Sequence, residues 1–216
     1  MSYYKGVLVT IEGGDGSGKS THVELLKSYL DSKGISFFAT REPGGTDFSE
    51  AVRALTKDTR FSDKSEISEL LLFEAARADI VKKRVIPALE RGDVVLMDRF
   101  FDSTTAYQSF GRGIPREVVD NANSIATYGI KPDITFYMRI EPQVAFERRG
   151  GVDLNDAMEI AGMEFHKRVM QGFDQIAKEN PDRFVIVDTT QSIDNVFQKI
   201  VSNFEKCWSK HNKEGK

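Results

Sequence analysis

Short apolar runs alternate along this chain with longer segments in which apolar residues recur every three or four positions. The apolar runs predict buried strands, because each is short and bounded by polar or turn-forming residues. They are Val7–Glu12, Ile35–Thr40, Val94–Asp98, Ile134–Ile140 and Phe184–Val187. Because a helical segment separates successive strands, the pattern predicts an α/β fold with a five-stranded parallel sheet covered by helices on both faces.

The helical segments begin and end at residues that suit helix termini. They are Lys19–Lys33, Ser65–Arg91, Glu117–Tyr128, Pro142–Arg149, Leu154–Lys178 and Ile193–Trp208. Gly34 and Gly92 follow two of these segments, where a left-handed C-terminal cap is favoured, and Ser65 suits an N-cap. Pro87 predicts a kink in the longest helix, because proline lacks the N–H of an internal hydrogen bond.

The length and composition agree with one soluble globular unit. With 216 residues, 40% of them hydrophobic and 29% charged, residues 1–216 are expected to form a single domain. The polar tail, 209–216, is expected to fray. A net charge of -3 gives no support for extended nucleic-acid binding.

The cysteine content and the lengths of the apolar runs indicate the cellular compartment of the protein. The single cysteine, Cys207, excludes an intramolecular disulfide and a multi-cysteine metal site. We find neither a signal peptide nor an apolar stretch long enough for a membrane span. A cytoplasmic protein without a membrane or nucleic-acid partner is therefore expected.

A phosphate-binding loop lies between the first predicted strand and the first predicted helix. Gly13-Gly14-Asp15-Gly16-Ser17-Gly18-Lys19-Ser20 matches G-x-x-x-x-G-K-[ST], and Thr21 continues into the helix. Glycines let the backbone amides and the helix N-terminus point at a phosphate chain. Lys19 would reach the terminal phosphates of ATP, and Ser20 would offer its hydroxyl to Mg²⁺. The alternative is a glycine-rich turn without a ligand.

Other nucleotide-binding classes fit less well. The chain has no Asn-Lys-x-Asp element for guanine, and it is short for a motor or a helicase. A small-molecule kinase remains, by analogy of fold. The three histidines have no metal-ligand spacing, so no metal other than nucleotide-bound Mg²⁺ is expected.

The segment that begins at the third predicted strand carries the most specific pattern. Asp98-Arg99-Phe100-Phe101-Asp102-Ser103-Thr104-Thr105-Ala106-Tyr107-Gln108 closely resembles the signature of the thymidylate kinase family. Four further segments are similar to that family in the same order, between Lys5 and about Phe204. They are Glu12–Gly16, Thr40–Thr46, Leu70–Arg77 and Glu164–Val169.

The resemblance implies a P-loop NTPase fold, ATP as donor, dTMP as acceptor and usually a homodimer. It implies that Phe73 stacks on thymine, that Arg77 binds a base carbonyl, and that Arg99 bridges the acceptor phosphate and the transferred group. Phe73 and Arg77 are four residues apart and share a helix face. The further acceptor-binding residues that the resemblance implies are Asp15, Arg41, Ser103, Thr104 and Tyr107.

Simpler roles for several of these residues stay open from the sequence. Phe73 suits an apolar core, and Arg77 suits a solvated or ion-paired helix face. Asp15 suits a turn, and Arg41 suits a surface ion pair. Asp98 is expected to hold Mg²⁺ with Ser20, partly through water, although a strand-end aspartate also serves as a cap.

The resemblance also implies a short helical lid at roughly 145–158. In one subgroup an arginine occupies the position of Gly16, so here a lid arginine should supply that catalytic charge beside Lys19 and Arg99. The segment Glu147–Asp153 is shorter than the common bacterial pattern, and its register does not decide between Arg148 and Arg149.

The expected reaction transfers the γ-phosphoryl group of MgATP to dTMP, giving ADP and dTDP for dTTP synthesis. Two alternatives remain at this point. One is a kinase for another nucleotide or nucleoside, and the other is a nucleotide-binding protein without turnover.

Overall fold

The computed structural model describes residues 4–150 and 161–214, without the side chains of Arg149 and Glu214. Its sheet has five strands, all parallel, in the order β2-β3-β1-β4-β5. The strands are β1 (Val7–Glu12), β2 (Phe37–Arg41), β3 (Val94–Asp98), β4 (Ile134–Arg139) and β5 (Phe184–Asp188). The predicted fold class is confirmed, and the strand ends differ from the predicted ones by at most two residues.

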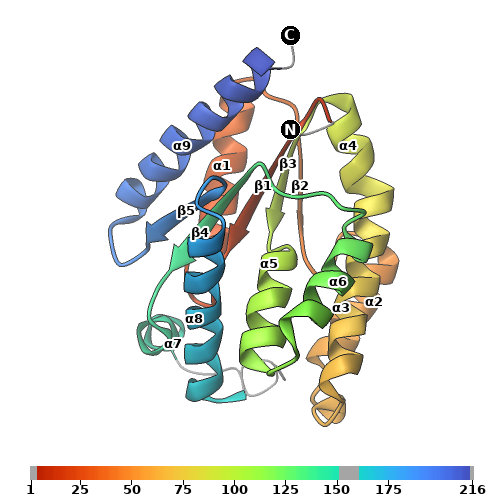
Figure 1. Cartoon of the computed structure of the whole chain (residues 1–216). Coiled ribbons are helices and arrows are strands. Elements are labelled where there is room, and N and C mark those ends of the chain that lie inside the picture. The colour runs from red at the N-terminus through yellow and green to blue at the C-terminus, as the bar shows by residue number, and fades with distance from the viewer. Residues whose placement is uncertain (1–3, 151–160, 215–216) are drawn as a thin grey trace.

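Two helices cover one face of the sheet, α1 (Lys19–Ser32) and α9 (Ile193–Glu214) (Figure 1). Val9 of the central strand lies in the same buried cluster as Leu26 of α1 and Ile200 of α9. Because side chains alternate along a strand, the odd-numbered residues of β1 supply this apolar contact.

The opposite face carries the remaining helices that matter for the site. They are α3 (Glu66–Ile80), α4 (Ile86–Arg91), α5 (Phe101–Thr104) and α8 (Met163–Glu179), with α6 (Arg116–Ala126) packed against α3 (Figure 1). Even-numbered residues of β1 point to this side. Leu8 packs with Ile80, whereas Thr10 and Glu12 are buried polar residues nearer the carboxyl end. This face therefore becomes polar where the strands end.

The longest predicted helix is continuous but changes its hydrogen-bond pattern. Ser65 caps α3 by accepting from the Ser68 amide, as expected. A π-helical segment, Val81–Val85, then joins α3 to α4, in which Pro87 occupies the first turn. Since Pro87 has no N–H, the Lys83 carbonyl loses its usual partner, and the wider π turn accommodates this loss.

Two helices are absent from the sequence prediction. Helix α2 (Asp47–Lys57) is capped by Thr46, whose side chain accepts from the Ser49 amide. Helix α5 continues through a π-helical segment, Thr105–Gly111. Helix α2 follows the segment Thr40–Thr46, and α5 lies within the segment Asp98–Gln108. The sequence analysis interpreted both segments only as ligand-binding.

The C-terminal prediction needs a correction. Helix α9 extends to Glu214, so the predicted helix end at Trp208 is wrong, and fraying of the polar tail stays a prediction. No proline or glycine interrupts positions 209–214, and His211 Nε2 lies 3.0 Å from the Lys5 carbonyl. Over the described part of the chain, we find no helix both apolar and long enough to cross a bilayer.

The predicted lid is only partly described. Helix α7 (Pro142–Arg149) has the predicted bounds, and α8 begins at Met163 rather than at Leu154. Residues 151–158 of the lid prediction lie outside the described residues.

Candidate active site

The functional residues gather at the carboxyl edge of three neighbouring strands. In the sheet register Ile11 of β1 pairs with Asp98 of β3, and Asp98 pairs with Arg41 of β2. The loops that follow these strands therefore meet, as ligand-binding loops do in open parallel sheets.

The loop after β1 adopts a backbone that requires glycine. Gly13, Gly16 and Gly18 have φ values of 138°, 76° and 86°. A Cβ atom on Gly13 would lie 2.6 Å from the Met138 carbonyl oxygen of β4, closer than van der Waals contact allows. The loop thus packs tightly on the sheet, and only glycine fits at position 13.

Lys19 is held inside this loop. Its Nζ donates to the Gly14 carbonyl at 2.8 Å and lies 4.0 Å from Asp15 Oδ1. Burial, and then the nearby charge of Arg99, lower the pKa of Lys19 to about 8. An anionic ligand would restore the charged form, because an opposite charge favours it.

Ser20 and Asp98 form a pair beside the loop. Ser20 Oγ donates to Asp98 Oδ2 at 3.3 Å. Within residues 4–150 and 161–214 we find no group of three or more His, Cys, Asp or Glu side chains that suits a metal ion. One hydroxyl and one carboxylate nevertheless suit Mg²⁺, which keeps several waters and binds mainly through nucleotide phosphates.

Arg99 connects the loop to the helix that follows β3. It has a φ of 70°, an unusual conformation for a residue with a side chain. Its Nη1 donates to the Gly13 carbonyl at 2.8 Å and to Ser103 Oγ at 3.1 Å. Its Nη2 donates to Asp15 Oδ1 at 2.6 Å, and the guanidinium lies 5.3 Å from the Tyr107 ring centre. This network fixes the guanidinium beside the phosphate-binding loop.

Glu12 is a buried carboxylate that the sequence analysis did not assign to the site. It is 0% exposed and accepts from the Phe100 amide at 2.7 Å and from Ser103 Oγ at 2.5 Å. It thereby holds the first turn of the helix that carries Ser103. Burial raises the pKa of Glu12 to about 8, and the charge of Asp102 contributes to the increase.

This pKa predicts a pH-dependent stability. An acid with a raised folded pKa contributes stability that is present below its unfolded pKa and is lost as pH rises through its folded pKa. We expect the free energy of unfolding to fall by roughly 3 kcal/mol between about pH 5 and pH 8, at about 1.4 kcal/mol per pKa unit. Urea unfolding across this range should show a flatter dependence in Glu12→Gln, and equal slopes would contradict the prediction.

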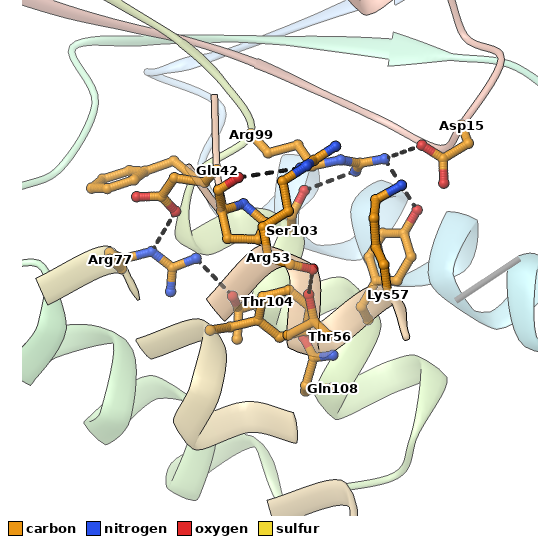
Figure 2. A pocket seen from close by; sticks show the side chains of 14 residues that line it. Asp15, Glu42, Arg53, Thr56, Lys57, Arg77, Arg99, Ser103, Thr104 and Gln108 are labelled. Atoms are coloured by element: carbon orange, nitrogen blue, oxygen red, sulfur yellow. Dashed lines mark hydrogen bonds and ion pairs between the residues drawn. The ribbon is translucent and has the colours of Figure 1, made fainter. Parts of the chain in front are cut away.

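A cavity adjoins the loop, with about 740 Å³ of empty space that includes its opening to solvent (Figure 2). Its lining includes seven residues that the sequence analysis proposed for the acceptor: Asp15, Phe73, Arg77, Arg99, Ser103, Thr104 and Tyr107. Phe73 is half-buried and faces this cavity, which speaks against a purely structural role in the core. The lining residues that the sequence analysis missed are Glu42, Pro43, Arg53, Thr56, Lys57, Phe100 and Gln108.

Arg77 is buried in a dense network on one wall of this cavity. Its Nε donates to Glu42 Oε2 at 2.8 Å, and its Nη1 donates to Glu74 Oε1 at 2.6 Å and to Asn123 Oδ1 at 3.1 Å. Its Nη2 donates to Thr104 Oγ1 at 2.8 Å (Figure 2). With 3% of its side chain exposed, Arg77 does not lie on a solvated helix face.

A second cavity of about 950 Å³ surrounds the phosphate-binding loop. Its lining residues are Asp15, Gly16, Gly18, Lys19, Ser20, Thr21, Arg41, Glu42, Arg53, Asp98, Arg99 and Arg148. Asp15, Glu42, Arg53 and Arg99 line both cavities, so the two cavities meet at these four side chains.

Two predicted arginines lie at this second cavity. Arg41 lines it but not the first one, and its Nη2 pairs with both carboxylate oxygens of Glu50. This geometry matches the surface ion pair, and a role at the acceptor phosphate stays a prediction. Arg148 also lines the cavity and donates to the Thr189 carbonyl at 2.8 Å.

Comparisons with known proteins agree with this geometry. The family model described as thymidylate kinase matches residues 11–200. A thymidylate kinase from Chlorobaculum tepidum is 40% identical over 94% of this chain and 99% of its own length. A second, from Thermoanaerobacter sp., is 40% identical over 94% of this chain and 98% of its own length.

A solved structure gives the same result. The crystal structure of thymidylate kinase from Ehrlichia chaffeensis superposes with a TM-score of 0.76 at 35% identity, over 92% of this chain and 98% of that one. The resemblance expected from the motifs is confirmed. With a matching fold, two adjoining cavities at the phosphate-binding loop and relatives of this similarity, the chain belongs to the thymidylate kinase family.

Proposed function

We propose that this chain, acting as a single kinase domain, transfers the γ-phosphoryl group of MgATP to dTMP and gives ADP and dTDP. One observation carries the proposal: the cavity around the phosphate-binding loop meets the cavity lined by Phe73 and Arg77, and Asp15 and Arg99 line both. A donor and an acceptor bound in these cavities would place their phosphates next to each other. Such positioning accounts for much of the catalysis of phosphoryl transfer.

The donor side rests on the loop that runs from Gly13 to Thr21. Its amides would bind the β- and γ-phosphates, and Lys19 would neutralise their charge. Ser20 and Asp98 would hold Mg²⁺, Asp98 partly through water. When bound, Mg²⁺ would supply charge neutralisation between the phosphates.

The acceptor side requires no protein base. The acceptor's own phosphate oxygen is the nucleophile and is already ionised near neutral pH. Arg99 would bridge this phosphate and the transferred group, because fixed positive charge stabilises the transition state. Phe73 would stack on thymine, Arg77 would bind a base carbonyl, and Tyr107 would lie along the deoxyribose with the Ser103 and Thr104 hydroxyls nearby.

The acceptor is tested with purified protein, MgATP and a panel of dTMP, dUMP, dCMP, dGMP and thymidine. We expect ADP release to be fastest with dTMP and to depend on Mg²⁺. Faster turnover of another member of the panel would identify that compound, and not dTMP, as the acceptor. ATP binding without any phosphorylated product would instead indicate a binding protein.

A lid arginine is proposed as the third positive charge at the transferring group. Arg148 already lines the donor cavity, where its Nη1 contacts the Thr189 carbonyl, and Arg149 is adjacent to it in sequence. Single-turnover phosphorylation should fall at least about tenfold in either Arg148→Ala or Arg149→Ala, since one stabilising charge is lost. Unimpaired turnover in both variants would remove the lid arginine from the mechanism.

We also propose a homodimer that works in the cytoplasm. The helices α2, α3 and α6 lie together on one side of the molecule and carry exposed apolar side chains (Figure 1). They are Phe48, Leu55, Ile67, Leu71, Val118 and Ile125. Exposed apolar side chains on neighbouring helices suit an interface between subunits. Sedimentation equilibrium should give twice the chain mass, and Leu71→Glu should shift it toward the monomer; a monomeric wild type would contradict the proposal.

A further inference from the structure

The floor of the acceptor cavity contains an amide whose orientation is fixed from outside. Gln108 lines the cavity, is 1% exposed, and lies on the π-helical segment after α5 (Figure 2). Its Nε2 donates to Glu69 Oε1 at 3.1 Å. Because an ionised carboxylate accepts hydrogen bonds and does not donate them, the nitrogen of this amide must face Glu69. The amide oxygen of Gln108 is therefore directed away from Glu69.

Glu69 itself is not part of the cavity lining and is held by two cations. Arg112 Nε lies 3.1 Å from Oε1, and Arg112 Nη2 lies 3.1 Å from Oε2. Lys64 Nζ is 3.7 Å from Oε2. With 2% exposure and a bidentate partner, this carboxylate is held in one position.

The neighbouring Arg77 supplies the opposite hydrogen-bond polarity. Four of its five N–H groups donate to Glu42, Glu74, Asn123 and Thr104. The fifth belongs to Nη2 and has no acceptor in the described part of the chain. The cavity thus offers a donor at Arg77 and, with the amide oriented by Glu69, an acceptor at Gln108.

The donor at Arg77 and the acceptor at Gln108 are complementary to the hydrogen-bonding groups on one edge of thymine. Thymine presents a carbonyl acceptor, O4, beside an N3–H donor, whereas cytosine presents an amino donor beside an N3 acceptor. We propose that Glu69 is a positioning residue that fixes the Gln108 amide so that the cavity accepts thymine and rejects cytosine. The inference rests on the proposed acceptor site and adds the group that sets its selectivity.

A site whose buried polar groups match a ligand rejects an analogue of reversed polarity strongly, because those groups would be left unpaired. Without Glu69 the Gln108 amide can rotate by half a turn and present its NH₂ group. Thymine then loses a partner, and cytosine gains one at N3.

The test compares Glu69→Met with Arg112→Ala. Both variants break the ion pair, but only the first removes the acceptor of the Gln108 amide. The ratio of kcat/KM for dTMP to kcat/KM for dCMP is measured with saturating MgATP. We expect this ratio to fall at least about tenfold in Glu69→Met, because the loss of one hydrogen bond changes affinity by about that factor. The change should lie in KM for dTMP, with kcat and KM for ATP within about twofold of wild type. Arg112→Ala should keep the ratio.

A second variant tests whether misfolding explains the loss of selectivity. Glu69→Met combined with Arg112→Met replaces the buried ion pair by apolar groups and leaves no unpaired guanidinium. It should show the same loss of selectivity as Glu69→Met. An unchanged ratio in both variants, with a wild type that phosphorylates dTMP, would overturn the role of Glu69 alone. A wild type that does not phosphorylate dTMP would overturn the proposed function and this inference with it.

Discussion

Arg99→Ala is expected to lower kcat for dTMP phosphorylation by about a thousandfold while the protein stays folded. The guanidinium lies where the two cavities meet and is fixed by the Gly13 carbonyl, Asp15 and Ser103. Its charge is therefore in place before the reaction, and no reorganisation accompanies the transition state. Rapid-quench measurement of ADP and dTDP formation checks the effect.

The control for this prediction is Arg91→Ala. Arg91 precedes the same strand at its opposite end, is largely exposed and pairs with Asp93. Its loss should leave kcat within about twofold of wild type, as a surface ion pair contributes little. Arg99→Lys should recover part of the activity, because it keeps the charge but not the forked geometry. Near-normal turnover in Arg99→Ala would contradict the role of Arg99.

Arg77→Ala is expected to cost about 3–5 kcal/mol of unfolding free energy, in addition to weakening dTMP binding. The loss would leave Glu42 and Glu74, both more than nine-tenths buried, without their cation. Burial raises the pKa of Glu42 to about 7 even in the presence of Arg77. Without Arg77 this carboxyl would hold its proton still more tightly.

Two further measurements separate stability from recognition. An acid with a raised folded pKa destabilises the fold as pH rises through that pKa, so the deficit of Arg77→Ala should be larger at pH 8 than at pH 5. Adding Glu42→Gln and Glu74→Gln to Arg77→Ala should restore much of the stability but not dTMP binding. A wild-type denaturant midpoint in Arg77→Ala would contradict the prediction.

The strands and the phosphate-binding loop were predictable because their signals are local. A strand that is buried on both faces appears as a short apolar run, and the loop has a fixed spacing of glycines ending in Lys19. Helix α2 was missed although Thr46 and Ser49 form its cap, because the Thr40–Thr46 segment was interpreted only as a ligand loop. Helix α9 was predicted too short, because the prediction ended at Trp208, where the sequence becomes polar, although polar residues do not break a helix.

The site was predicted only in part for the same reason. Phe73, Arg77 and Arg99 lie in segments that resemble the family, and the structure brings them to one cavity. Glu12 and Gln108 also lie in such segments, but their roles depend on partners from other strands and helices. A buried carboxylate at the end of an apolar strand was the one local signal that could have indicated Glu12.

By itself, the sequence determined the layered fold, the loop for a nucleoside triphosphate and the class of acceptor. The fold and the loop follow from hydrophobic periodicity and a contiguous motif. The acceptor class follows from the resemblance of contiguous segments to the thymidylate kinase family. All of these are properties of neighbouring residues. The tertiary structure alone decided that Arg77 is bound by Glu42 and Asn123, 35 and 46 residues away in the chain, and that Glu69 orients Gln108 across 39 residues. Hydrogen-bond polarity in a buried site depends on which distant groups the fold brings within about 3 Å, and sequence spacing does not contain that information.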